Sequence, residues 1–210
     1  DVANLKDNSN VKLNHEVHLK TLRTKNGQVK LDCRDCHTPS EDHKTIEKIN
    51  FEKDCQACHS LEFDDRLSGK EVPHGNPDVV YKFLYAEYAK LLLSSENTAS
   101  GTQDLIQRFK PGGSVNAARN DTSPEEFKRV FVERESRNAE RLLFTKTACY
   151  LCHRVVEKTV SDQDANQQSV SKFEVMKPQI PEKWMPAAKF DHEAHEPIKC
   201  DDCHSAAPDP

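Results

Sequence analysis

The chain has 210 residues and a formal net charge of −5, with 31% charged and only 35% hydrophobic residues. With so few apolar residues, the chain can bury little apolar surface to offset the conformational entropy that it loses on folding. Something other than side chains should therefore supply part of the interior. The mild acidity and the lack of a basic run give no reason to expect nucleic acid as a partner. No run of about twenty apolar residues occurs, so we expect no membrane span.

Residues 1–75 form the first predicted module and carry two Cys-x-x-Cys-His pentads, Cys33–His37 and Cys55–His59. The stretch "LNHEVH" ahead of them places His15 and His18 three positions apart. Residues at this spacing lie on one face of a helical turn, where two imidazoles cannot readily bind the same face of one metal ion. They can each bind a different one.

Two further histidines of this module lie in different settings. His74 stands in "EVPHGNP", a turn flanked by proline and glycine in which a fixed loop can present an imidazole as a metal ligand. His43 stands in the charged run "SEDHKTIEK", which is typical of an exposed histidine. His74 is therefore a predicted ligand and His43 is not.

Residues 76–144 are predicted as a helical insertion with a polar linker. In "NPDVVYKFLYAEYAKLLL", Asn76 is a plausible N-cap and Pro77 takes the first helical position. Apolar residues at helical spacing predict a buried stripe of Val80, Phe83, Leu84, Tyr88, Leu91 and Leu92. The following run, rich in Ser, Asn and Gly, is typical of an exposed linker.

A second helix is predicted from "SPEEF", where Ser123 is the cap, Pro124 takes the first position and Glu126 completes a capping box. We expect it to run on into the third pentad. Its middle, "ERESRNAER", is charged on nearly all faces, which favours a solvated surface.

Residues 145–210 form the last predicted module, with the pentads Cys149–His153 and Cys200–His204. The stretch "FDHEAH" repeats the His-x-x-His spacing at His192 and His195, again ahead of a pentad. The two ends of the chain therefore carry the same pair of motifs in the same order.

All eight cysteines fall in the four pentads. Disulfides do not require a histidine directly after every second cysteine. A four-cysteine zinc site tolerates the gap between Cys36 and Cys55, but the gap between Cys152 and Cys200 is too long, and zinc leaves the four histidines without a role. Covalent haem c uses every residue, because the thiols form thioethers with the two vinyl groups and the histidine ligates iron.

The sequence therefore predicts four covalently bound haem c groups. Their attachment residues are Cys33, Cys36, Cys55, Cys58, Cys149, Cys152, Cys200 and Cys203, with His37, His59, His153 and His204 as the first iron ligands. The candidates for the second axial positions are His15, His18, His74, His192 and His195. With histidines in surplus, Met176 and Met185 are not expected to bind iron. The surplus candidate His195 could serve a haem of another chain.

These motif-bearing segments, roughly 11–75 and 145–210, resemble the cytochrome c3 family of multihaem cytochromes, whose Phe-x-His-x-x-His element ties two haems together. The resemblance does not cover the chain between them. It implies that the first histidine of each pair ligates the next haem along the chain. His15 would then lie opposite His37 and His192 opposite His204, with His18 and His195 serving other haems.

We expect a mainly α fold with extensive irregular loops, little or no β structure and a haem-dominated core. Two histidines on every iron leave no position for a substrate, so the prediction is an electron-transfer protein with low-potential haems and not an enzyme. Its partners would be redox proteins acting as electron donor and acceptor, or further copies in a homo-oligomer, filament or larger cytochrome complex. The alternative is a multihaem oxidoreductase with one open-site catalytic haem.

Haem attachment requires exported, reduced thiols, which predicts a periplasmic or extracellular protein. The polar stretch that opens at Asp1 shows no signal-peptide pattern, so we expect the sequence to begin after processing.

Overall fold

The computed structural model describes residues 9–24, 27–41, 45–96, 124–158, 170–179 and 191–203. The chain divides into two compact units. Unit 1 comprises Asp1–Ser60, Leu151–Arg154 and Met176–Pro210, and unit 2 comprises Leu61–Tyr150 and Val155–Val175. The segments 1–75 and 145–210 each contribute residues to both units.

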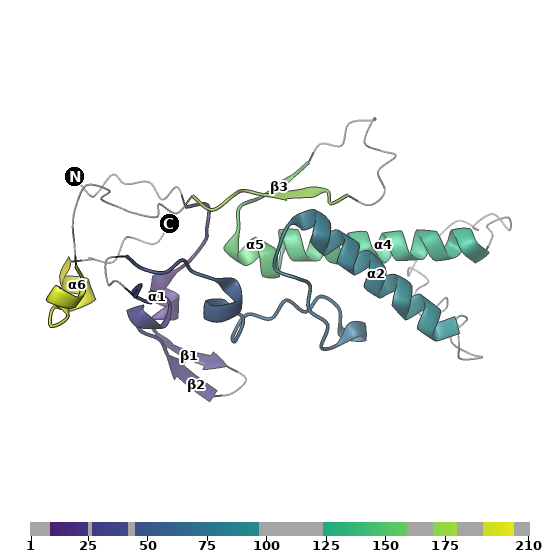
Figure 1. Cartoon of the computed structure of the whole chain (residues 1–210). Helices are drawn as coiled ribbons and strands as arrows, with labels where there is room; N and C mark the ends of the chain where they lie inside the picture. The colour runs from purple at the N-terminus through teal and green to yellow at the C-terminus, as the bar shows by residue number, and fades with distance from the viewer. Residues whose placement is uncertain are drawn as a thin grey trace. The chain divides into compact units, whose positions relative to one another are not determined.

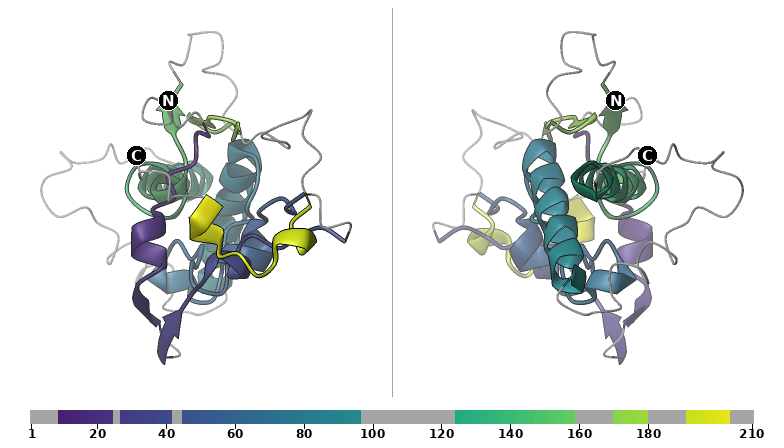
Figure 2. Two further views of the ribbon diagram at one scale, coloured as in Figure 1. Left: turned by 90° about the vertical axis from the view of Figure 1, so that its left-hand side faces the viewer. Right: turned by 90° about the vertical axis from the view of Figure 1, so that its right-hand side faces the viewer.

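Unit 2 is built on two long helices, α2 (Pro77–Glu96) and α4 (Pro124–Thr145), which pack against each other (Figure 1). In Figure 2, α4 is seen nearly end-on beside α2. The predicted start of α2 is confirmed, because Asn76 Oδ1 accepts the backbone N–H of Asp78 at 2.8 Å. The start of α4 is also confirmed, although its expected cap, Ser123, lies outside the described residues. No helix in the described ranges has the length and apolar character needed to cross a membrane.

The buried apolar side chains of the described residues all belong to unit 2. On α2, the predicted stripe is confirmed for four positions, Val80, Leu84, Tyr88 and Leu92, whereas Phe83 and Leu91 are only half-buried. Tyr81, which the stripe omits, is fully buried. The facing side of the core comes from Phe131, Val132, Ala139, Leu143 and Phe144 of α4. This apolar interface holds unit 2 together.

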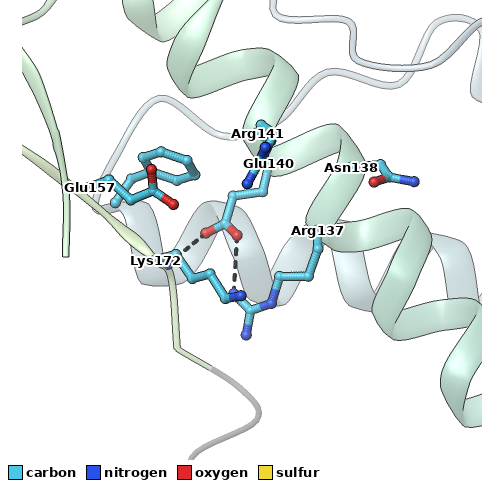
Figure 3. Close-up of a pocket in the computed structure, with 7 residues that line it drawn as sticks. Arg137, Asn138, Glu140, Arg141, Glu157 and Lys172 are labelled. Carbon is cyan, nitrogen blue, oxygen red and sulfur yellow. Dashed lines mark hydrogen bonds and ion pairs between the residues drawn. The ribbon is translucent and has the colours of Figure 1, made fainter. Parts of the chain in front are cut away.

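The charged middle of α4 is not a fully solvated surface as predicted, because only part of it is exposed. Glu135 and Glu140 are buried, and the Glu140 carboxylate accepts hydrogen bonds from Arg137 Nη1 and from the backbone N–H of Lys172, both at 3.0 Å (Figure 3). The Arg137 guanidinium also lies over the Tyr81 ring, 3.8 Å from its centroid. A carboxylate can be buried when charged and backbone donors satisfy it, so the charge pattern alone indicated the wrong face.

A second ionic cluster fixes the segment around η4 (Asp65–Leu67) to both long helices. Arg66 is paired with Asp64 and, at 2.7 Å, with Glu135 of α4, while the hydroxyl of Tyr88 on α2 donates to Asp64 at 2.7 Å. Burial opposes ionisation of Asp64, but the donors of Arg66 and Tyr88 outweigh it and hold the pKa of this carboxyl below its usual range. These ion pairs and hydrogen bonds therefore hold the segment around η4 against α2 and α4.

Helix α4 ends at Thr145 and does not run on into the third pentad as predicted. The backbone N–H groups of Lys146 and Thr147 both bond to the Leu142 carbonyl at 3.0 Å, and Ala148, where the next helix begins, has a φ of 30°, outside the right-handed helical range. A separate short helix, α5 (Ala148–Cys152), then carries the two cysteines of the pentad. The break separates the pentad from the long helix.

The prediction of a mainly α fold with little or no β structure is wrong, since the described residues are 47% helical and include two small antiparallel sheets. β1 (Thr21–Thr24) pairs with β2 (Gly27–Lys30) in unit 1, and β3 (Val155–Glu157) pairs with β4 (Phe173–Val175) in unit 2. Strands this short show no alternation that the sequence could reveal. The overlooked signal is the dipeptide Asn26-Gly27, which is typical of tight hairpins.

Unit 1 has a different kind of interior. None of its described residues is buried, and its helical pieces are single turns, among them α1 (His15–His18). Several large apolar side chains are exposed instead, including Val17 at 50% and Leu151 at 56%. Side chains of the described part of unit 1 therefore do not provide the burial that stabilises unit 2.

Candidate functional site

Each of the four pentads lies on a short helical turn. η2 (Cys33–Asp35) carries the first and is capped by Asp32, and η3 (Phe51–Cys55) leads into the second and is capped by Asn50. The third lies on α5 and the fourth on α6 (Cys200–Cys203). Residues three apart share one side of a helical turn, so the turn suits two thiols that must reach the same group.

The histidine that ends a pentad is fixed to the turn in the first two motifs. The backbone N–H of His37 donates to the Cys33 carbonyl at 2.9 Å, and that of His59 donates to the Cys55 carbonyl at 3.0 Å. The same hydrogen bond therefore fixes the backbone of each histidine, and with it the position of the side chain relative to the two cysteines. The equivalent residue of the fourth motif, His204, lies outside the described residues.

The third pentad is joined to the N-terminal segment of unit 1. The backbone N–H of Lys12 donates to the Cys152 carbonyl at 2.8 Å, and Val11 forms an antiparallel bridge with His153. Asn10 Nδ2 donates to the Lys177 carbonyl at 3.0 Å. Three stretches that are far apart in the sequence therefore meet a few residues before α1.

Cysteines from three different pentads lie close together in unit 1. None of the eight cysteines, all of which the structure describes, is in a disulfide. Burial raises the pKa of the Cys55 thiol, and the neighbouring Cys36 and Cys152 raise it further. Burial also raises the pKa of Cys36, with Asp54 and Asp35 adding to the effect. Cysteines of three pentads therefore interact electrostatically, although the sequence separates them widely.

Each histidine of α1 faces the terminal histidine of a different pentad. The ring centroids of His15 and His37 are 6.4 Å apart with planes 19° apart, and those of His18 and His59 are 6.0 Å apart. A metal ion bound at about 2.0–2.1 Å by one nitrogen of each ring separates the ring centres by roughly 6.2–6.4 Å. The first pair is the one that the resemblance implied, and the second gives His18 a partner that the sequence did not assign.

Asn14 builds the turn that presents these two histidines. Its side-chain Oδ1 accepts the backbone N–H of Val17 at 2.8 Å, and its backbone carbonyl bonds to Nδ1 of His18 at 2.7 Å. A carbonyl can only accept, so the ring proton lies on Nδ1 and the lone pair on Nε2. Metal-binding histidines commonly have this arrangement, which leaves the lone pair of Nε2 as the one that could bind a metal ion.

The second His-x-x-His element repeats the contact between carbonyl and Nδ1, and its side-chain contact reaches the N–H two positions on, where that of Asn14 reaches the N–H three positions on. Oδ1 of Asp191 accepts the backbone N–H of Glu193 at 2.9 Å, and the Asp191 carbonyl accepts from Nδ1 of His195 at 2.8 Å. His192 is half-buried and immediately precedes the turn η5 (Glu193–His195). Because His204 lies outside the described residues, the pairing of His192 with His204 stays a prediction.

The other candidate ligands lie in varied surroundings. His74 is exposed in the turn before α2 and belongs to unit 2, and His153 is half-buried. Met176 is 41% exposed. His43 and Met185 lie outside the described residues.

The donor groups that the structure brings together in unit 1 are two pairs of histidines, each beside a pair of cysteines. Within the described ranges, no three His, Cys, Asp or Glu side chains converge as a self-contained metal site. The chain matches no family model, no curated protein and no solved structure.

Asn14 and Asp191 are site residues that the motif spacing does not identify. A signal was present, because the two elements read "NHEVH" and "DHEAH", with a residue typical of turn caps directly before the first histidine. The spacing of the histidines draws attention to the ligands and not to the residue that orients them.

Proposed function

We propose that the chain is a tetrahaem c-type cytochrome that carries electrons between redox proteins. The observation that carries the proposal is the opposition of His15 to His37 and of His18 to His59, at ring separations of 6.4 Å and 6.0 Å. These separations are close to what one metal ion held by imidazole on both faces requires. Each opposed pair also includes the histidine of a Cys-x-x-Cys-His turn, which supports covalent attachment at the same place.

The residues fit four haem c groups. One group would be held by Cys33, Cys36, His37 and His15, and the next by Cys55, Cys58, His59 and His18. The attachment residues of the other two are Cys149, Cys152 and His153, and Cys200, Cys203 and His204. Their second ligands would come from His74, His192 and His195.

The composition of unit 1 supports the same proposal. Its described residues include most of the attachment motifs and no buried side chain, whereas the haem-free helices of unit 2 have an apolar core. Leu13, Val17 and Leu19, which surround the two histidines of α1, are exposed large hydrophobic residues. Burial of such side chains against flat apolar groups would provide the missing hydrophobic stabilisation.

Bound haem would supply a one-electron redox centre whose potential depends on its axial ligands and surroundings. The chain would hold each iron through two histidines, such as His15 with His37 and His18 with His59, which would leave no position for a substrate and favour electron transfer over catalysis. Histidine ligation without methionine predicts low potentials. The proximity of Cys36, Cys55 and Cys152 supports close packing of the redox centres.

The partners in this proposal are redox proteins that donate and accept electrons through weak, transient contacts. Further copies of the chain in a homo-oligomer or filament, or a larger cytochrome complex, are the other partners that a surplus histidine would suit. Attachment of haem to cysteine thiols places the protein in the periplasm or outside the cell.

The test is the mass of the denatured protein, produced in a host that attaches haem c. We expect the mass of the chain plus four haems, and a ferric spectrum that is low-spin throughout. The double substitution Cys200→Ala and Cys203→Ala should remove the mass of one haem. A mass equal to that of the bare chain, or zinc released by acid, would rule the proposal out.

A further inference from the structure

We propose that Asn14 and Asp191 are positioning residues, which orient the second histidine of each His-x-x-His element toward iron. The inference rests on the proposed haem function and adds to it two residues that are not ligands. It is supported by hydrogen bonds that recur in two distant parts of the chain.

Each of these residues makes two different hydrogen bonds. The side-chain oxygen closes the turn, through the N–H of Val17 for Asn14 and the N–H of Glu193 for Asp191, at 2.8 Å and 2.9 Å. The backbone carbonyl of the same residue accepts from Nδ1 of the histidine four positions later, at 2.7 Å and 2.8 Å. Because both acceptors belong to one residue, opening the turn also moves the carbonyl that holds the ring.

This carbonyl controls two properties of the histidine. It places the proton on Nδ1, so that the lone pair on Nε2 is the one that binds metal. It also restrains rotation of the ring, which in His18 is the ring that faces His59 at 6.0 Å. A hydrogen bond from the opposite ring nitrogen further makes imidazole a stronger donor to the metal. Loss of the cap should therefore weaken the bond between His18 and iron without removing either ligand.

Capping alone does not produce this arrangement. Asn76 likewise caps α2 through the N–H of Asp78, but its carbonyl accepts from the backbone N–H groups of Val79 at 2.9 Å and Val80 at 3.1 Å and, within the described residues, from no histidine ring. Asn76→Ala is therefore a control for the loss of an asparagine cap as such, because this cap holds no histidine ring.

The experiment measures carbon monoxide binding to the fully reduced full-length protein, since carbon monoxide can bind a six-coordinate haem only after a histidine leaves. We expect Asn14→Ala to raise the rate of carbon monoxide binding at one haem by about 10-fold to 100-fold. Removal of a group that orients a metal ligand typically weakens metal binding by a factor of this size. Asn14→Asp and Asn14→Ser keep an oxygen acceptor and should restore the parental rate. Asp191→Ala should act likewise, and Asp191→Asn should not. Asn76→Ala should leave the rate unchanged.

The mass of each variant is measured first and should show four haems. If the alanine variants carry four haems and bind carbon monoxide at the parental rate, the positioning role is wrong while the cytochrome function stands. An equal rise in Asn76→Ala would also overturn it, because the effect would then be general loss of stability. A parental protein without haem would overturn both proposals.

Discussion

The imidazole rings of His18 and His59 have their centroids 6.0 Å apart, although the two residues come from different turns of unit 1. His15, on the same turn as His18, faces His37 of another pentad at 6.4 Å. The single turn α1 therefore places one histidine opposite each of two pentads. If both pairs bind iron, α1 fixes the distance between two redox centres, and changes to its two histidines should affect different haems.

His15→Ala should leave all four thioether-bound haems in place and convert one of them to a five-coordinate or solvent-ligated state. Loss of a histidine ligand should raise the potential of that haem. Ferric spectra and a redox titration would show a high-spin component from one haem in four. His43→Ala is the control and should change neither measurement, because the sequence around His43 predicts an exposed residue.

The pairing of His18 with His59 can be tested by combining substitutions. The double change Cys55→Ala and Cys58→Ala removes one attachment site, and in that background His18→Ala should cause no further high-spin signal. His15→Ala should still cause one, because its partner is a different pentad. If His18→Ala still produces a new high-spin haem in this background, His18 serves a haem other than the one at His59.

Unit 2 should fold without haem, whereas unit 1 should not. All buried apolar residues among the described positions lie in unit 2, so replacing all eight cysteines by serine leaves that core intact. Hydrogen exchange on this full-length variant should show protected amides in α2 and α4 and rapid exchange in β1 and β2. Equal protection of both units would show that unit 1 has a stable core of its own.

Arg137→Ala should strongly destabilise unit 2, because it leaves the Glu140 carboxylate buried with only the Lys172 N–H as the donor described here. Breaking a buried ion pair by removing one partner typically costs about 3–5 kcal/mol. Glu133→Gln, which alters a more exposed partner of Arg137, should cost about 0–1 kcal/mol. Urea unfolding followed by circular dichroism would compare the two. Similar losses in both would mean that the burial of Glu140 is unimportant.

The depressed pKa of Asp64 should make unit 2 sensitive to acid. A carboxyl whose folded pKa lies below its unfolded value adds stability above the unfolded pKa, about 3.9, and loses this contribution as pH falls through the lower folded value. Asp64→Asn should therefore lower stability at pH 7 and flatten its decline below about pH 4. An unchanged decline would assign the acid sensitivity to other carboxyls.

Local features of the chain were largely predictable and its long-range assembly was not. The starts of α2 and α4 follow from Asn-Pro and Ser-Pro pairs, because capping depends on neighbouring residues. The opposition of His15 and His37 was implied by resemblance alone, and no local rule gives His18 its partner. Burial of Glu140 depends on the backbone of Lys172, which is distant in the sequence and directly precedes β4. A sequence rule that assigns charged residues to the surface takes no account of such a distant hydrogen-bond donor.

Unit 1 is built from three separate stretches of the chain, which become available one after another during synthesis. A chain that leaves the ribosome or an export channel from its N-terminus presents α1 and both facing pentads within the first sixty residues. Those two ligand sets can therefore be complete while most of unit 2 is still to come. Cys152 can join Lys12 only after both long helices have emerged, and α6 follows them in the chain. If these residues bind haem, the sites would be completed in the order in which the chain emerges.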